Sequence, residues 1–199
     1  MYDPYDFYFQ KAKKEWFKAR SAFKLEEIDQ KFHLFDKNTK NILDIWCAPG
    51  SWMQYAVSRC QKNNVKNYQV IWLDLKEVEL NMPWVHHYVQ DVTDVEAVKK
   101  ILNERNITKL DLIQSDMAPN TIWFKDIDAM RSIGLLESTL RVYKTMLAPN
   151  WRFVIKIFMW PWFDEFILDL KKHFWWKNIK TFKPKSCRKE SKETYIIKI

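Results

Sequence analysis

Short apolar runs alternate with stretches of helical periodicity along most of the chain. Six runs rich in β-branched and large apolar residues predict strands at 41–46, 69–74, 85–89, 110–115, 153–158 and 194–199. Between them, apolar side chains recur every three or four positions, as in amphipathic helices. Such alternation is typical of βαβ units. We therefore expect an α/β protein with an open, mainly parallel sheet and helices on both faces.

The helix signals also bear on domain organisation. Helices are predicted at about 94–105, 133–147 and 163–170. The first begins at a capping box formed by Thr93 and Glu96. A further helix, with Phe23, Ile28 and Phe32 in its apolar stripe, lies in a basic N-terminal segment at about residues 5–35. No linker interrupts the pattern, so we expect one domain over residues 1–199.

Composition narrows the class of protein. Of 199 residues, 47% are hydrophobic and 29% charged, enough for a folded core. No apolar stretch is long enough to span a membrane, and no secretory signal is visible. Three separated cysteines, Cys47, Cys60 and Cys187, argue against a disulfide scaffold or a zinc site and favour the cytoplasm. The net charge of +8 favours a polyanionic partner such as nucleic acid, with a merely solvated basic surface as the alternative.

Carboxylates lie inside, at the end of, or just after the first three predicted strands, with Asp44 inside the first. Asp44 precedes the turn Cys47–Trp52, which opens a helix but has neither a dinucleotide-binding glycine pattern nor a P-loop. Asp74 ends the second strand, where a carboxylate can accept both ribose hydroxyls, and Asp91 after the third can hold an adenine amino group. Each residue alone reads as a cap or a solvated turn. Together, at consecutive strand ends, they predict a nucleoside site.

An acid and a lysine stand out in the next two strands. Asp116 ends the fourth strand, and Lys156 lies inside the apolar fifth strand. An unpaired buried ammonium is costly, so Lys156 either pairs with Asp116 from a neighbouring strand or snorkels from an edge strand. A lysine whose pKa falls on burial can serve as a general base.

Five segments together resemble the FtsJ family of S-adenosylmethionine-dependent ribosomal RNA 2′-O-ribose methyltransferases. They are Arg20–Asp29, Leu43–Trp52, Ser115–Asn120, Phe153–Phe158 and Lys183–Tyr195, in the family's order. The resemblance implies a Rossmann-like methyltransferase fold with about seven strands and no metal. It implies a catalytic tetrad of Lys24, Asp116, Lys156 and Glu193. It also implies contacts to S-adenosylmethionine from Gly50, Trp52, Asp74, Asp91 and Asp116.

The chemistry implied by the resemblance is methylation of a ribose 2′-hydroxyl. Lys156 would take the hydroxyl proton and Asp116 would orient it, while Lys24 and Glu193 position the ribose and tune the charge. Whether Lys24 or the two carboxylates dominate the pKa of the base stays open. The implied substrate is a uridine of large-subunit ribosomal RNA, bound by a monomer in the cytoplasm.

Two basic clusters flank the tetrad in sequence. The first holds Lys11, Lys13, Lys14, Lys18 and Arg20, and the second holds Lys180, Lys183, Lys185, Arg188, Lys189 and Lys192. Each leads into one end of the tetrad, so we expect them to form an RNA-binding rim. Adjacent His86 and His87 point to opposite faces of a strand and are interpreted as structural.

The chain holds only two glycines but 11 tryptophans. Tryptophan stands where the family has glycine at positions 16, 46, 72, 84, 123, 151, 160 and 162, whereas Trp52 matches a family tryptophan. One hypothesis is a misassigned UGA codon, which some bacterial lineages read as glycine and others as tryptophan. The other is real divergence, in which Trp46 blocks the pocket of a non-catalytic RNA-binding or ribosome-assembly factor. A nicotinamide-dependent oxidoreductase is disfavoured because the phosphate-binding turn is missing.

Overall fold

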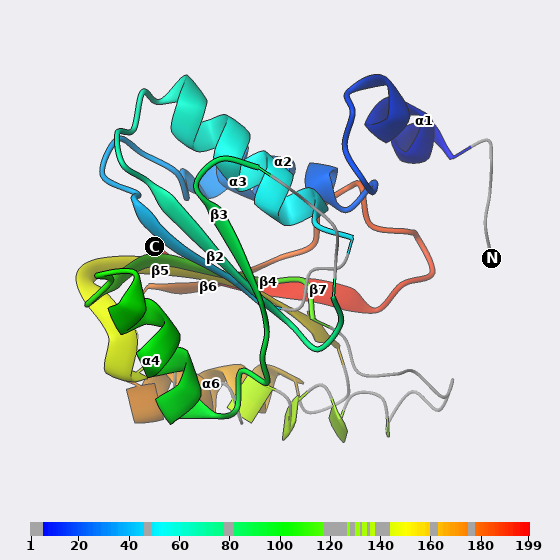
Figure 1. Cartoon of the computed structure of the whole chain (residues 1–199). Helices are drawn as coiled ribbons and strands as arrows, with labels where there is room; N and C mark the ends of the chain where they lie inside the picture. Colours follow the sequence, from blue (N-terminus) through cyan, green and yellow to red (C-terminus); the bar gives the residue numbers. More distant parts are fainter. Residues whose placement is uncertain are drawn as a thin grey trace.

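A computed structural model shows one seven-stranded sheet between helices (Figure 1). It describes residues 6–45, 49–77, 82–117, 127, 130–131, 133–134, 136–137, 144–159, 163–174 and 178–199. The strands are β1 (Asn41–Ile45), β2 (Gln69–Asp74), β3 (Val85–Val89), β4 (Leu110–Ser115), β5 (Leu147–Phe158), β6 (Ile179–Phe182) and β7 (Glu193–Lys198). The helices are α1 (Phe7–Lys14), α2 (Ala22–Phe32), α3 (Ser51–Lys62), α4 (Val95–Glu104) and α6 (Phe163–Phe174).

The strand order is β3-β2-β1-β4-β5-β7-β6, with β3 to β5 parallel and β7 antiparallel to both of its neighbours. The chain winds outward in one direction from β1 to β3 and in the other from β4. The switch point therefore lies between β1 and β4, and ligands of such sheets bind beyond the carboxyl ends of the strands there. The predicted α/β class and mainly parallel sheet are confirmed.

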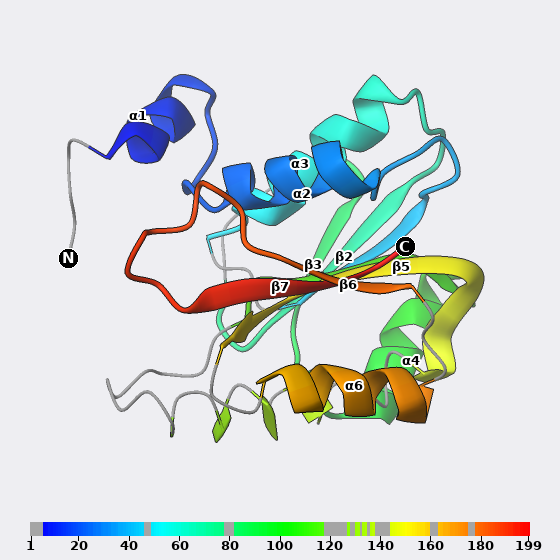
Figure 2. The same ribbon diagram turned by 180° about the vertical axis from the view of Figure 1, so that it is seen from behind.

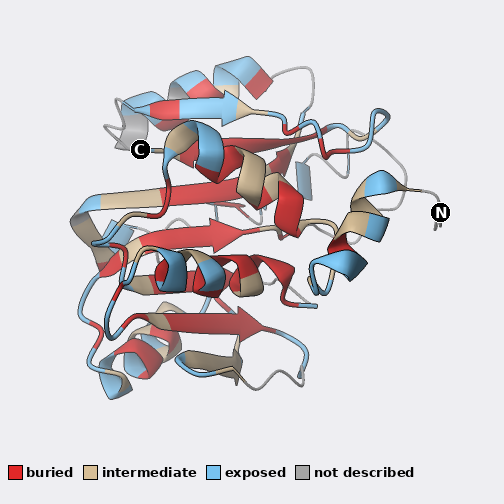
Figure 3. Ribbon diagram, turned by 90° about the horizontal axis from the view of Figure 1, so that it is seen from above, coloured by how far each residue is buried: buried red, intermediate tan, exposed pale blue. Residues whose placement is uncertain are grey.

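Helices cover both faces of the sheet, as the two opposite views show (Figures 1 and 2). α2 and α3 pack on one face over a core that includes Ile28, Trp52 and Ile197. α4 and α6 pack on the other face, where Ile101 of α4 and Leu170 of α6 are part of a second core. Viewed from above, the central strands are almost entirely buried (Figure 3). Near-continuous apolar strands suit a sheet covered in this way.

Most predicted element boundaries agree with the structure within one residue, but two strands differ. β5 starts at Leu147, six residues before the predicted start at 153, across a register irregularity between Leu110 and Leu112. β6 lies at the edge of the sheet with one fully buried side chain, so it has no apolar run that predicts a strand. Part of the helix predicted over 133–147 lies outside the described residues, and β5 already begins at its last position.

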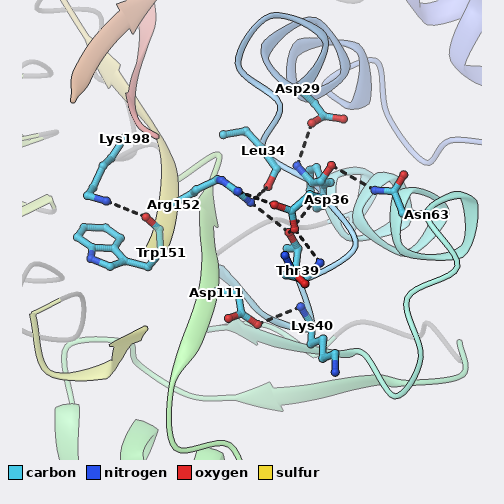
Figure 4. A network of polar contacts seen from close by, with 12 residues as sticks. Asp29, Leu34, Asp36, Thr39, Lys40, Asn63, Asp111, Trp151, Arg152 and Lys198 are labelled. Atoms are coloured by element: carbon cyan, nitrogen blue, oxygen red, sulfur yellow. Dashed lines mark hydrogen bonds and ion pairs between the residues drawn. The ribbon is translucent and has the colours of Figure 1, made fainter. Parts of the chain in front are cut away.

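A polar network fixes the amino ends of the central strands (Figure 4). The Arg152 guanidinium donates to the Leu34 carbonyl at 3.2 Å and pairs with the Asp36 carboxylate at 2.6 Å. One Asp111 oxygen accepts the backbone N–H groups of Lys40 and Asn41 at 3.0 and 2.9 Å. These charge-assisted bonds tie β4 and β5 to the segment before β1, at the end of the sheet opposite the switch-point site.

Trp16 occupies a helix-ending position that favours glycine. The Phe17 N–H donates to the Ala12 carbonyl at 2.9 Å, and the Trp16 N–H donates to the Lys13 carbonyl at 3.3 Å. These are the two bonds of a Schellman motif that ends α1. Its left-handed residue is Trp16, with φ 62°. Glycine is the usual residue at this position because it has no Cβ to clash with the backbone.

Trp84 occupies a position that also favours glycine, in a tight turn before β3. The Val85 N–H donates to the Met82 carbonyl at 3.2 Å, closing a β-turn with Pro83 in its second position. Trp84 in the third position has φ 67°. A proline followed by a positive φ is the pattern of a type II turn, whose third residue is normally glycine. Among the tryptophans at family glycine positions that the structure describes, Trp16 and Trp84 thus have glycine-type backbone geometry.

The two other described tryptophans at family glycine positions, Trp72 and Trp151, do not have a positive φ. Trp72 is fully buried in β2, and Trp151 stacks on Phe153 with ring centroids 5.5 Å apart. Positions 46, 123, 160 and 162 lie outside the described residues. The backbone evidence for the glycine hypothesis therefore comes from positions 16 and 84.

Candidate active site

A lysine and a carboxylate from neighbouring strands meet at the carboxyl end of the sheet. The Lys156 Nζ lies 3.0 Å from Asp116 Oδ1, and it also donates to the Asp116 backbone carbonyl. The side chains are 10% and 15% exposed, so Lys156 is not a snorkelling edge residue. The predicted pair follows from the sheet order, because β4 and β5 are adjacent and parallel.

A second ion pair joins α2 to the start of β7. The Lys24 Nζ lies 2.7 Å from Glu193 Oε2, with side chains 11% and 10% exposed. Lys24 lies in the first turn of α2, while Glu193 opposes Phe158 in the β5–β7 ladder. Two residues separated by 169 positions in sequence thus meet beside the Lys156–Asp116 pair.

The two pairs influence each other electrostatically. Burial alone would lower the pKa of Lys24, but the Asp116 and Glu193 carboxylates outweigh it and raise the pKa above 10.5. Burial alone would raise the pKa of Asp116, but Lys156 and Lys24 outweigh it and hold the pKa below 3.8. Lys24 therefore stays a cation and Asp116 an anion at neutral pH. The four groups that the resemblance implied lie in one cluster.

Tyr195 is a supporting residue that the sequence did not single out. Its hydroxyl donates to Asp116 Oδ1 at 2.9 Å, and it sits opposite Lys156 in the β5–β7 register. Burial, together with the Asp116 charge, raises the pKa of Tyr195 well above 10, so the hydroxyl keeps its proton. The cross-strand position relative to Lys156 is the signal that identifies it, and it becomes visible only once the register is known.

An apolar cavity of about 120 Å³ opens beside this cluster at the switch point. It is lined by Ile45, Leu73, Asp74, Leu75, Gln90, Asp91, Val92, Thr93 and Met117. Met117 directly follows Asp116 in the chain. An apolar space with two carboxylates in its lining has the chemistry that an adenosine needs, because its ring needs apolar contact and its hydroxyls need acceptors. The structure therefore supports the sequence prediction of a nucleoside site.

The implied cofactor contacts fall into two groups. Asp74 and Asp91 line the cavity, where Asp91 Oδ1 also accepts the Thr93 N–H in a local turn. Gly50, with φ 98°, precedes α3, and Trp52 is fully buried with its Nε1 donating to the Ser21 carbonyl at 2.8 Å. Contact of these four residues, and of Asp116 in the lysine–carboxylate cluster, with a cofactor stays a prediction. The turn residues 46–48 and 118–120 lie outside the described residues.

Other residues singled out in the sequence have structural surroundings. Cys60 and Cys187 are buried free thiols, and burial raises the pKa of each to about 12. The His87 ring packs 4.7 Å from the Trp72 ring, in line with a structural role. The described part of the chain has no group of side chains suited to a metal ion and no helix long and apolar enough to cross a membrane.

The raised pKa of Lys24 predicts how the cluster responds to alkaline pH. A folded-state pKa above the unfolded value means that the stability contribution of Lys24 is complete below about pH 10.5 and is lost as the pH rises through the folded value. We expect Lys24→Met to cost about 3 kcal/mol at neutral pH, as breaking a buried ion pair does. Urea unfolding across this pH range should show the gap between wild type and variant closing above pH 10.5. A gap that stays constant would contradict the prediction.

Comparison with known proteins identifies relatives over nearly the whole chain. The profile of the FtsJ-like methyltransferase family matches residues 17–199. The protein called ribosomal RNA large subunit methyltransferase E of Pelagibacter ubique is 42% identical, with 96% of this chain and 90% of that protein covered. The protein of the same name from Desulfatibacillum aliphaticivorans is 40% identical, with 96% of this chain and 88% of that protein covered.

Solved structures agree with these relatives. A crystal structure described as a ribosomal RNA methyltransferase from Plasmodium falciparum superposes with a TM-score of 0.76 at 27% identity, over 92% of this chain and 97% of that one. Human methyltransferase-like protein 13, solved with SAH, shares the fold at 9% identity and a TM-score of 0.59. The resemblance drawn from the five sequence segments is confirmed, and the chain belongs to the FtsJ-like methyltransferase family.

Proposed function

We propose that this methyltransferase transfers the methyl group of S-adenosylmethionine to a ribose 2′-hydroxyl of large-subunit ribosomal RNA, at a uridine. The observation that carries the proposal is the meeting of two buried lysine–carboxylate pairs beside an apolar, carboxylate-edged cavity. The names of the enzymes that match this chain support RNA as the substrate. They favour an enzyme over a non-catalytic assembly factor.

Each member of the cluster has a distinct role in this proposal. Lys156, in its neutral form, accepts the proton of the 2′-hydroxyl at Nζ. Asp116 holds that amine through its carboxylate and its backbone carbonyl, and Tyr195 fixes the carboxylate. The Lys24 cation and Glu193 bind the ribose and set its orientation, which lowers the entropic cost of reaction.

The cavity would hold the adenosine part of S-adenosylmethionine. When bound, this cofactor supplies a methyl group activated by its attachment to a positively charged sulfur. Asp74 would accept the cofactor ribose hydroxyls and Asp91 the adenine amino group. The apolar part of the cavity lining would exclude water around the adenine.

The proposal includes a monomer in the cytoplasm. All four members of the cluster come from one chain, so no second copy is required to complete the site. The exposed lysines of the two basic clusters supply the surface for RNA.

The test is transfer of an isotope-labelled methyl group to large ribosomal subunits and to their free ribosomal RNA. We expect the label to be in the RNA. After alkaline hydrolysis it should be recovered in a dinucleotide, because a 2′-O-methyl group blocks cleavage of the bond next to it. Label on a base, or on protein only, would overturn the proposed reaction. Label at a nucleotide other than uridine would overturn only the assigned target.

A further inference from the structure

The segment between β6 and β7 has no helix or strand of its own. This C-terminal basic loop, residues 183–192, carries exposed Lys183, Lys185, Arg188, Lys189 and Lys192. It leads directly into Glu193 at the start of β7. Inside the loop, the Lys183 Nζ donates to the Ser191 carbonyl at 2.6 Å. Contacts from α2 and from the turn before it also hold the loop.

Two charged side chains hold the backbone of the loop. The Glu27 carboxylate accepts the Lys185 N–H at 2.6 Å with one oxygen and the Ser186 N–H at 2.8 Å with the other. The Arg20 guanidinium donates to the Ser186 carbonyl and pairs with Asp6 on its other side. Ser186 is fully buried, where unpaired backbone polar groups would be costly. Its N–H and its carbonyl are both satisfied by ionised side chains. Hydrogen bonds of this type are roughly twice as strong as neutral ones.

The spacing of these residues connects the loop to the catalytic cluster. Arg20, Lys24 and Glu27 are four and three residues apart, so they lie on one side of α2 and its preceding turn. Between the two loop contacts, Lys24 pairs with Glu193. We infer that Glu27 is a positioning residue: it holds the C-terminal basic loop on α2, so that the loop's cations and Glu193 face the RNA in a fixed arrangement. This inference rests on the proposed function.

Charge and positioning predict opposite effects for Glu27. Its carboxylate is negative and lies against the backbone of a loop whose cations would bind an anionic RNA. If charge alone mattered, its removal would strengthen RNA binding. If it positions the loop, its removal leaves two N–H groups without their acceptor and loosens the loop, which weakens RNA binding. The sign of the change therefore separates the two roles.

Glu26 provides a matched control on the same helix. It has the same charge, but its carboxylate pairs with Lys11 at 3.4 Å and does not contact the loop. Glu27→Gln is the conservative variant, because its amide oxygen can still accept one of the two N–H bonds.

The experiment measures the affinity of each variant for free large-subunit ribosomal RNA, and the kcat and KM of methyl transfer. We expect Glu27→Ala to weaken RNA affinity about tenfold and to raise KM, with Glu27→Gln in between. Glu26→Ala should bind RNA as tightly as wild type or more tightly. All variants should bind S-adenosylmethionine equally. A Glu27→Ala protein that binds RNA as tightly as Glu26→Ala would overturn the inference.

Amide hydrogen exchange supplies a readout that needs no RNA. The Lys185 and Ser186 amides should exchange faster in Glu27→Ala but not in Glu26→Ala. Unchanged exchange at both amides would also overturn the inference. A wild-type protein that neither binds ribosomal RNA nor methylates it would overturn the proposed function, while the exchange data would still decide whether Glu27 holds the loop.

Discussion

Replacing Lys156 by alanine is expected to lower kcat for methyl transfer by about 10²- to 10⁴-fold, the usual contribution of a positioned general base. The Lys156 Nζ is held by Asp116 through two contacts, and Tyr195 holds the same carboxylate. Lys24 is paired with Glu193, and the Asp116 and Glu193 carboxylates raise its pKa, so we expect it not to replace Lys156 as the base.

Lys156→Arg separates proton acceptance from positive charge. Arginine keeps the cation and its donors but stays protonated at all accessible pH values, so it cannot take a proton. We expect it to be as inactive as Lys156→Ala. Calorimetric titration with S-adenosylmethionine should show that both variants bind the cofactor with wild-type affinity. Transfer that survives in Lys156→Ala, or that returns in Lys156→Arg, would exclude Lys156 as the base.

Restoring glycine at positions 16 and 84 is expected to stabilise the protein by about 2 kcal/mol in total. A left-handed backbone costs a residue with a side chain about 1–2 kcal/mol, and the greater flexibility of glycine in the unfolded state offsets part of the gain. The lost side chains contribute little, because Trp16 is 88% and Trp84 54% exposed. The two turns are separate, so the effects should add. Urea unfolding of Trp16→Gly, Trp84→Gly and the double variant measures the change.

Trp52 is the control for this prediction. It matches a family tryptophan, is fully buried and uses its indole N–H on the Ser21 carbonyl. Trp52→Gly should therefore destabilise the protein by about 3–5 kcal/mol, the opposite sign. If Trp16→Gly and Trp84→Gly are destabilising too, the tryptophans are native and the divergence hypothesis gains. Reading the gene gives an independent answer, because UGG codons at these positions would exclude a reassigned UGA.

The positive-φ residues explain why the codon hypothesis could be tested only after the structure was known. Other described residues with positive φ include Asn64, Asn67 and Asn106. Asparagine tolerates this region, whereas a bulky residue there is an outlier. The sequence showed too few glycines and too many tryptophans. The backbone shows that, among the described positions, 16 and 84 have the positive φ that favours glycine.

The sequence predicted the sheet well because its strands are continuous apolar runs. It missed the first part of β5, where Pro149 and Asn150 interrupt the run, and it missed β6, which buries little at the sheet edge. Pattern reasoning also predicted the Asp116–Lys156 pair, because consecutive parallel strands are usually neighbours. The Lys24–Glu193 pair lay beyond such reasoning, since no local spacing relates an early helix to the last strand. Only the family resemblance implied it.

β7 is the last strand in the sequence, yet it lies inside the sheet between β5 and β6. It carries Glu193, the carboxylate of one lysine–carboxylate pair, and Tyr195, which donates to the Asp116 carboxylate of the other. Detachment of β7 would break the β5–β7 and β6–β7 ladders together and leave β6 without its strand neighbour. We therefore expect proteolysis that removes β7 to give inactive protein, while molecules that keep β7 stay fully active. Partly trimmed molecules of intermediate activity are not expected.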